Sequence, residues 1–160
     1  MPTYDPNYYI AFTHVRDLKA LFEANLATYL AAFAEDTVTA DYELEDVTWY
    51  DYEKSTFEKI PAGLLLPERT TVVGQERGSD IFQTQIMLYV VIRDTKNRYP
   101  QRISLYEKAI RDCVNATPTA YGRDYWIGEA SYGMSRNSGS IRIKDLALTA
   151  YGRGQLDHPA

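Results

Sequence analysis

The sequence predicts an α+β fold in which a mostly antiparallel β-sheet is covered on one face by two α-helices. Two segments repeat apolar residues at three- and four-residue steps, as amphipathic helices do, and several others alternate apolar with other residues, as half-buried strands do. The order of these segments is helix, strands, helix, strands, which is typical of an α+β sandwich. The 160 residues contain no repeat or low-complexity linker, so a single domain is expected over residues 1–160.

The first helix is expected to begin near Thr13 and to end in the segment Ala34–Thr37. Residues 1–12 are predicted to be a lead-in, although Asp5 and Pro6 could instead be an N-cap and a first helical residue. The apolar stripe of this helix recurs at helical spacing and consists of Val15, Leu18, Phe22, Leu26, Tyr29, Leu30 and Phe33.

Two short strands are predicted between this helix and the middle of the chain. The acidic and aromatic segment Asp41–Lys54 carries the first strand, with an irregularity near Glu45–Asp46. Gly63–Leu66 forms the second, which Pro67 ends, and extended structure resumes at Thr70–Val73.

A long strand from Asp80 to Asp94 is the strongest strand signal, and a loop or hairpin tip at Gly74–Ser79 precedes it. One row of alternate residues is almost entirely apolar and is expected under the helices: Phe82, Thr84, Ile86, Leu88, Val90 and Ile92. The other row mixes amide, aliphatic and aromatic side chains: Gln83, Gln85, Met87, Tyr89 and Val91. That second face is too apolar for simple exposure and too polar for a second core. It is typical of a surface that a partner covers, and the alternative is that other parts of the same chain cover it.

The second helix is expected to begin at Pro100, because proline suits the first helical position, and to end at Asn115–Pro118. Its apolar stripe consists of Ile103, Tyr106, Ile110 and Cys113 or Val114.

Two strands close the fold, at Trp126–Met134 and Ile141–Tyr151, with a polar loop at 135–139 between them. The apolar phase of the last strand changes across Lys144–Asp145, which indicates either a bulge or a switch of the covered face. The chain from Gly152 onward, and residues 153–160 above all, is predicted to be a loose tail.

Composition and charge exclude several classes of protein. A net charge of −5 argues against a protein that wraps nucleic acid, which needs a dense basic face. The single cysteine, Cys113, cannot form an internal disulfide and fits a reducing cytoplasm. No apolar run is long enough to cross a bilayer, and the start MPTYDPNYYI lacks the pattern of a secretory signal. The 14 tyrosines suit either protein contact surfaces or simple coverage of a sheet.

Residues that could carry chemistry are few. His14 and His158 have no second histidine or cysteine at ligand spacing, so no zinc site with local ligands is expected, and His14 is predicted to be a helix-surface or boundary residue. Cys113 is expected in the core. No phosphate-cradling loop or nucleophile elbow is present. We therefore expect no enzyme activity, no metal and no cofactor.

Six carboxylates form an acidic cluster in the sequence: Asp41, Glu43, Glu45, Asp46, Asp51 and Glu53. On a strand the first three would share a face, and clustered acids can hold a hard cation or act in acid–base catalysis. The segment lacks the glycine-punctuated loop of a calcium-binding hand, so a solvated acidic face is expected.

The layout resembles that of the tail terminator, or tail completion, proteins of long-tailed bacteriophages. The resemblance is one of pattern and covers the chain from about Val15 to Arg153. The segments that carry it are HVRDLKALFEANLATYLAAF, GLLLP, the loop into IFQTQIMLYVVIRD, PQRISLYEKAIRDCV and SIRIKDLALTAYGR.

The resemblance implies a ring, usually a hexamer, that sits on the last ring of the tail tube, halts polymerisation and presents a surface to the neck of the filled head. The implied partners are further copies of this chain, the tail tube protein and a head-neck protein, with no membrane. The implied location is the tail–neck region of the virion, after assembly in the host cytoplasm, and genome DNA would pass through the lumen.

Three sets of residues follow from this implied function. Self-association is expected through Gln83, Gln85, Met87, Tyr89 and Val91 of the long strand. The six acids from Asp41 to Glu53 are hypothesised to line or rim the lumen, where they would repel phosphates. Exposed loops are expected to contact the tube or neck through Gln75, Glu76, Arg77, Ser135, Arg136 and Asn137.

Three alternatives remain open from the sequence. The chain could be another neck component, such as a head-completion or connector protein, which would share small size and ring symmetry. It could be a small hydrolytic enzyme that uses the acids from Asp41 to Glu53. It could also be a monomeric regulatory domain.

Overall fold

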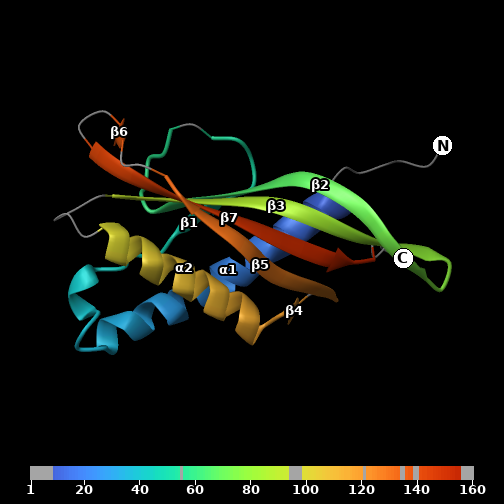
Figure 1. Cartoon of the computed structure of the whole chain (residues 1–160), viewed down its shortest axis with the longest axis horizontal. Helices are drawn as coiled ribbons and strands as arrows, with labels where there is room; N and C mark the ends of the chain where they lie inside the picture. The colour runs from blue at the N-terminus through green and yellow to red at the C-terminus, as the bar shows by residue number, and fades with distance from the viewer. Residues whose placement is uncertain are drawn as a thin grey trace.

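The computed structural model of this chain describes residues 9–54, 56–93, 99–120, 122–133, 136–138 and 141–155. Two long helices lie on one face of a seven-stranded sheet (Figure 1), which confirms the predicted α+β class. The helices are α1 (Ile10–Glu35), the short 3-10 helix η2 (Ala40–Tyr42) and α2 (Tyr99–Ala116). The strands are β1 (Thr48–Tyr50), β2 (Ala62–Glu76), β3 (Ser79–Arg93), β4 (Thr119–Ala120), β5 (Arg123–Tyr132), β6 (Arg136–Ser138) and β7 (Ile141–Gly154).

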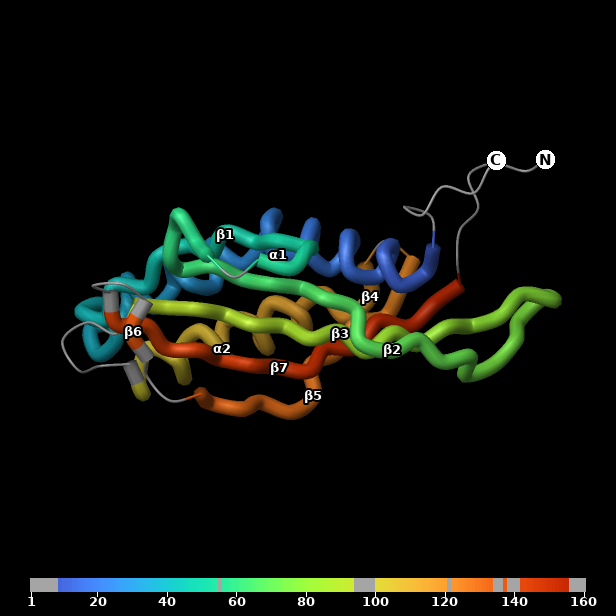
Figure 2. Tube along the Cα trace, turned by 90° about the horizontal axis from the view of Figure 1, so that it is seen from above, coloured from blue at the N-terminus to red at the C-terminus, as the bar shows by residue number. Residues whose placement is uncertain are grey.

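The sheet order is β1-β2-β3-β7-β5-β4, with β6 paired to β7. The pairing is antiparallel throughout, except that β1 runs parallel to β2. The β2–β3 hairpin extends past the rest of the sheet at one end of the molecule (Figure 2), because the pairing of β3 with β7 stops at Phe82 and Gly154. No helix of the described residues is long and apolar enough to span a membrane.

The core lies between the sheet and the two helices. The predicted apolar row of β3 from Thr84 to Ile92 faces the helices and is fully buried, and the predicted α2 stripe is buried with it. In α1 the residues Val15, Leu18, Phe22, Leu26 and Leu30 are buried, whereas Tyr29 and Phe33 are partly buried against the core. Burial of each large apolar side chain stabilises the fold by roughly 1.5–3 kcal/mol.

Helix α1 begins at Ile10, earlier than predicted, because Ile10 and Thr13 are already buried against the fold. The predicted lead-in is therefore too long, and the alternative start at Asp5 and Pro6 lies outside the described residues. The helix ends at Glu35, inside the segment predicted for its end.

The predicted strand from Asp41 is wrong, since only Thr48–Tyr50 pairs with the sheet and Ala40–Tyr42 is a 3-10 helix. The cause is helix α2, which binds the backbone of this segment. Arg102 donates hydrogen bonds to the carbonyl oxygens of Tyr42 (3.1 Å), Glu43 (3.4 Å) and Arg93, and the Tyr106 hydroxyl donates to the carbonyl oxygen of Glu45 at 2.8 Å. These carbonyls are satisfied by side chains and need no strand neighbour.

The prediction that Pro67 ends a short strand is also wrong, because β2 continues through it to Glu76. The partner β1 pairs only with residues 62–64, so β2 is an edge strand at Pro67, where a missing N–H is tolerated. The register against β3 shifts directly after it, between Pro67 and Arg69. The predicted loop before β3 is a tight hairpin whose two turn residues, Arg77 and Gly78, have φ values of 53° and 78°, as a type I′ turn requires.

The last strand extends further than predicted. β7 pairs with β3 from Ile143 to Gly154 without a register shift, so the phase change at Lys144–Asp145 is a switch of the covered face and not a bulge against β3. The segment from Gly152, predicted as tail, is held in the sheet as far as Gly154. An added Cβ on Gly152 would lie 2.9 Å from the Tyr125 ring, so the strand approaches that ring more closely than any other residue would allow.

Two further boundaries differ in the C-terminal half. β5 runs from Arg123 to Tyr132, so it starts three residues before the predicted Trp126. Part of the predicted polar loop at 135–139 is strand, since β6 pairs with the start of β7.

Candidate assembly surface

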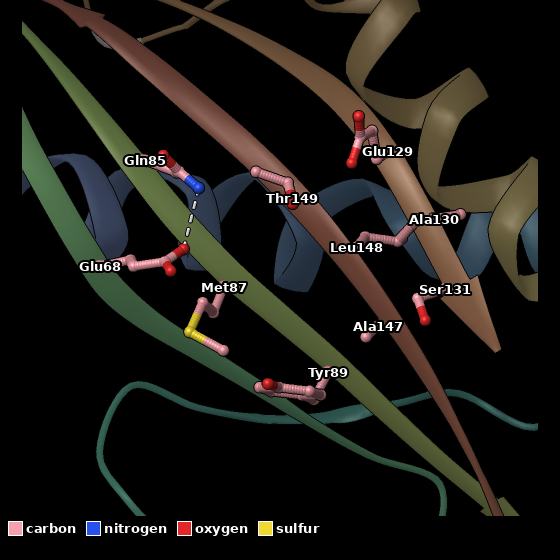
Figure 3. A pocket seen from close by; sticks show the side chains of 10 residues that line it. All are labelled: Glu68, Gln85, Met87, Tyr89, Glu129, Ala130, Ser131, Ala147, Leu148 and Thr149. Carbon is pink, nitrogen blue, oxygen red and sulfur yellow. Dashed lines mark hydrogen bonds between the residues drawn. The ribbon is translucent and has the colours of Figure 1, made fainter. Parts of the chain in front are cut away.

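The face of the sheet opposite the helices is uncovered at its centre, and Figure 3 looks onto it with the helices behind the strands. We call this surface the open face. Strand register places its side chains next to one another in rows across β2, β3, β7 and β5. The open face comprises Leu64, Leu66, Gln83, Gln85, Met87, Tyr89, Trp126, Ser131, Ala147, Thr149 and Tyr151.

The centre of the open face is a hollow of about 260 Å³. Met87 and Tyr89 of β3 line it together with Ala147 and Thr149 of β7, while Glu68 lies at its β2 side. The Gln85 amide donates a hydrogen bond of 2.9 Å to the Glu68 carboxylate, which holds both polar groups at the rim. The lining of the hollow is therefore mixed: Met87, Tyr89 and Ala147 give it apolar surface, while Glu68, Gln85, Glu129, Ser131 and Thr149 add polar groups. Protein interfaces combine apolar and polar surface in this way.

An aromatic pair extends the open face toward β5. The rings of Trp126 and Tyr151 stack with centroids 5.3 Å apart and planes 15° from parallel. Gly128 makes room for this pair, since a Cβ there would lie 3.0 Å from the Tyr151 ring. Both aromatic side chains are only half-buried, so the stacked pair adds apolar surface to the open face.

The residues predicted for self-association fall on two parts of this face. Gln83, Gln85, Met87 and Tyr89 are partly exposed on the open face. Val91 is only 3% exposed, so the chain itself covers that end of β3, as the alternative interpretation anticipated for the whole face. The sequence analysis did not include Leu64, Leu66, Trp126 and Tyr151. The alternation of side chains within β2 and β5 indicates which residues share a face. It does not indicate that these strands lie in the same sheet region as β3, because that depends on the strand order.

The six predicted acids are all exposed but do not form one strand face. Asp41 lies in η2, Glu43 to Asp46 lie in the segment held by α2, and Asp51 and Glu53 follow β1. Among the described residues there is no group of three or more acidic, histidine or cysteine side chains placed to hold a metal ion.

The two predicted contact loops lie at opposite ends of the molecule, with the β2–β3 hairpin tip at one end and β6 at the other (Figures 1 and 2). Gln75, Glu76 and Arg77 are exposed at the hairpin tip, where Gln75 donates to the Asp80 carboxylate at 3.0 Å. Asn137 is exposed in β6. Ser135 lies outside the described residues, as does the side chain of Arg136.

The prediction for His14 is wrong, because this side chain is fully buried. Its Nδ1 lies 2.7 Å from the Thr84 hydroxyl, which explains the one polar residue in the core row of β3. Burial, helped by the nearby Arg123 guanidinium, lowers the pKa of His14 to about 4, so the ring is neutral at pH 7. Arg123 in turn donates to the Asp17 carboxylate at 2.6 Å. This buried polar cluster fixes α1 to the sheet.

Cys113 is buried in α2, as predicted, and burial raises the pKa of its thiol to about 11. A neutral, inaccessible thiol packs as an apolar side chain and does not act as a nucleophile.

Comparison with solved structures finds similar chains, one of which comes from a virus-like particle. The chain is similar to a chain of the virion of a native gene transfer agent particle, at 14% identity and a TM-score of 0.38, over 83% of this chain and 93% of that chain. No family model matches the chain, and no curated protein matches it.

Proposed function

We propose that this chain is a structural phage protein that forms a ring, caps the tail tube, stops its polymerisation and joins the tail to the head neck. The observation that carries the proposal is the open face, where Met87, Tyr89 and the Trp126–Tyr151 pair form an apolar surface that the described chain leaves uncovered at its centre. Exposed apolar patches of this kind are typical of interaction sites.

A second copy of the chain is the proposed occupant of the open face. Each Å² of apolar surface that a neighbouring copy covers contributes about 25 cal/mol to association. If the contact is head-to-tail and the rotation closes, the copies form a ring. Six copies is the number that the resemblance to tail terminator proteins implies.

Capping by such a ring is steric. One side of the ring would match the last ring of the tube, and the other would offer no tube-like site to a further subunit. The two contact regions support this arrangement, because the hairpin tip (Gln75, Glu76 and Arg77) and β6 (Arg136–Ser138) lie at opposite ends of the molecule (Figures 1 and 2). One loop is proposed to contact the tube and the other the neck.

The acids from Asp41 to Glu53 are proposed to line or rim the lumen. All six are exposed, and their charge would repel the phosphates of the genome as it passes. Replacing four of them by lysine is expected to slow genome ejection, measured as DNA release from purified particles. An unchanged release rate would contradict the assignment of these acids to the lumen, but it would not contradict the proposed ring.

Native mass spectrometry of the purified chain tests the proposal, alone and mixed with tubes assembled from the tail tube protein of the same virus. A closed ring bound at tube ends, with tubes that no longer lengthen, is the expected result. A chain that stays monomeric and ignores the tubes would contradict it. Binding to filled heads in preference to tubes would instead favour a head-completion or connector protein.

A further inference from the structure

The hollow at the centre of the open face has a carboxylate on each of two sides. Glu68 lies at its β2 side and Glu129 at its β5 side, with β3 and β7 between them (Figure 3). Both residues are exposed. The other described side chains that line the hollow are neutral, and none of them is a lysine, arginine or histidine. The lining therefore carries negative charge that no neighbouring cation in the lining balances.

Neither carboxylate is neutralised by the rest of the described chain. The Gln85 amide donates a hydrogen bond to Glu68 but supplies no charge, and neither glutamate forms an ion pair with another described residue. The open face has two arginines of its own, Arg69 and Arg153, which the strand register places toward the hairpin and which do not line the hollow. A second copy that covers the hollow would therefore remove both carboxylates from water, which is costly unless that copy brings a cation.

The lining of the hollow suits an arginine side chain. Met87, Tyr89 and Ala147 offer apolar surface to its stem, and the Tyr89 ring can also hold a cation over its face. The planar guanidinium directs N–H donors to several sides, where the two carboxylates and the hydroxyls of Ser131 and Thr149 can accept. Lysine places all its donors on one atom and cannot spread them in this way.

The helix layer is the surface of the next copy that a head-to-tail contact would bring against the open face, because it lies on the opposite side of the sheet (Figure 3). Arg16 of α1 is the exposed cation of this layer with the least complete local partner. Its side chain is 51% exposed, and its Nε lies 3.4 Å from the Asp17 carboxylate. Arg123 binds the same carboxylate at 2.6 Å, so two guanidinium groups share one negative charge. The other cations of α1 and α2 are paired or buried: Lys19 with Glu23, Lys108 with Asp112, Arg111 with Glu107, and the buried Arg102.

The outer side of α1 is also more apolar than that of α2. Phe12 is 49% exposed one turn before Arg16, and Ala24, Ala27 and Ala31 are exposed further along the helix. The outer side of α2 instead carries polar residues: Gln101, Ser104, Lys108 and Asn115. A helix with apolar residues on every side is typically covered on every side. The outer side of α1 therefore has the character of a contact surface.

We infer that α1 of one copy lies across the open face of the next copy and that its Arg16 enters the hollow between Glu68 and Glu129. This inference rests on the proposed function and specifies which surface of the second copy meets the open face. The contact is head-to-tail, because the open face and the outer side of α1 are different surfaces of one chain. The hairpin tip and β6 take no part in it and are left to the tube and the neck.

Removal of charge with little change of shape tests the inference on the full chain. Glu68→Gln, Glu129→Gln and Arg16→Gln are each expected to weaken self-association about tenfold or more in sedimentation velocity, because each leaves a covered charge without its partner. If no cation met the covered carboxylates, the two glutamate variants would instead strengthen association, since they remove the cost of desolvation. Glu58→Gln changes an exposed glutamate outside both surfaces and should have no effect.

Charge exchange gives an independent readout. Arg16→Glu and Glu129→Arg should each abolish rings in native mass spectrometry, and the double variant Arg16→Glu/Glu129→Arg should restore them. The matched control Lys108→Glu/Glu129→Arg reverses a cation of α2 instead and should not restore them. If the unaltered chain forms rings but the exchange does not restore them, or the glutamine variants do not weaken them, the inference is overturned and the proposed function stands. If the unaltered chain is monomeric at every concentration, both are overturned.

Discussion

His14 and Thr84 meet inside the protein although they are 70 positions apart in the chain. Each interrupts an apolar pattern, and the hydrogen bond between His14 Nδ1 and the Thr84 hydroxyl offsets part of the cost of burying them, although His14 Nε2 has no hydrogen-bond partner among the described residues. The Asp17–Arg123 pair, 106 positions apart, does the same beside them. Sequence periodicity reports only local spacing, and for this reason it placed His14 at the surface.

The buried histidine makes stability depend on pH. Its pKa is about 4 in the folded chain and about 6.5 when unfolded, so the unfolded state gains a proton first as pH falls. The part of the free energy of unfolding that depends on a neutral His14 is fully present above pH 6.5. It is lost as the pH falls from 6.5 to 4 and amounts to about 3 kcal/mol at most. Urea unfolding at pH 7 and pH 4.5 should show a smaller loss in His14→Gln than in the unaltered chain. An equal loss of stability in both chains would contradict the lowered pKa of His14 in the folded state.

Gly63 permits a close contact that no other residue allows. A Cβ there would lie 2.3 Å from the Trp49 ring, which stacks on Phe22 with centroids 4.8 Å apart. Gly63→Ala should therefore lower the free energy of unfolding by about 2–3 kcal/mol through overpacking. Gly74→Ala is the matched control in the same strand, where the nearest atom would be 3.8 Å away. Chemical denaturation of both variants measures the difference, and equal stability would contradict the packing described.

At the scale of elements, helices and long strands were predictable because their signals are periodic and local. The α2 stripe and the core row of β3 repeat over several turns or several residue pairs. The stripe is buried as predicted, and so is the row from Thr84 to Ile92, whereas Phe82 at its start is only partly buried. The segment between α1 and β1 was not predictable, because its conformation depends on Arg102 and Tyr106 of a helix about 60 residues later. The open face was predictable in β3, but its contributions from β5 and β7 depend on a strand order that the sequence does not encode locally.

Among the contacts between elements, we expect those of Arg102 to contribute most to holding the acidic segment in place. Its guanidinium is buried and donates to backbone carbonyls of η2 and β3, so Arg102→Met leaves those acceptors without a charged donor. A loss of roughly 2–3 kcal/mol in the free energy of unfolding is expected. Limited proteolysis should then cleave first within residues 40–47. Tyr106→Phe, which removes the hydroxyl that donates to the Glu45 carbonyl oxygen and also contacts Arg102, should cost about 1 kcal/mol. Similar values for both variants would contradict this ranking.

In the molecule as a whole, the two faces of the sheet differ in how far the rest of the chain covers them. The helices cover the centre of one face, and the open face keeps Met87, Tyr89 and Trp126 partly in contact with solvent. The proposed contact with a second copy of the chain would cover this face.

Assembly through the open face predicts a specific effect of charge. Tyr89→Lys should weaken self-association at least tenfold without changing the thermal midpoint of the isolated chain, since this side chain is not in the core. Tyr52→Lys replaces an exposed tyrosine away from the open face and should have no effect. Sedimentation velocity across a concentration series separates the two variants. Equal self-association of both would remove the open face from the interface.

Hydroxyl-radical footprinting of the assembled and the diluted chain tests the central claim most directly, because it reports which side chains a neighbouring copy covers. Trp49 is buried in either state and serves as the internal reference. Oxidation of Met87, Tyr89 and Trp126 should fall several-fold on assembly while that of Trp49 stays constant. Unchanged oxidation of these three residues in an assembled sample, or the absence of any assembled state, would contradict the claim that this face is covered by another copy of the chain.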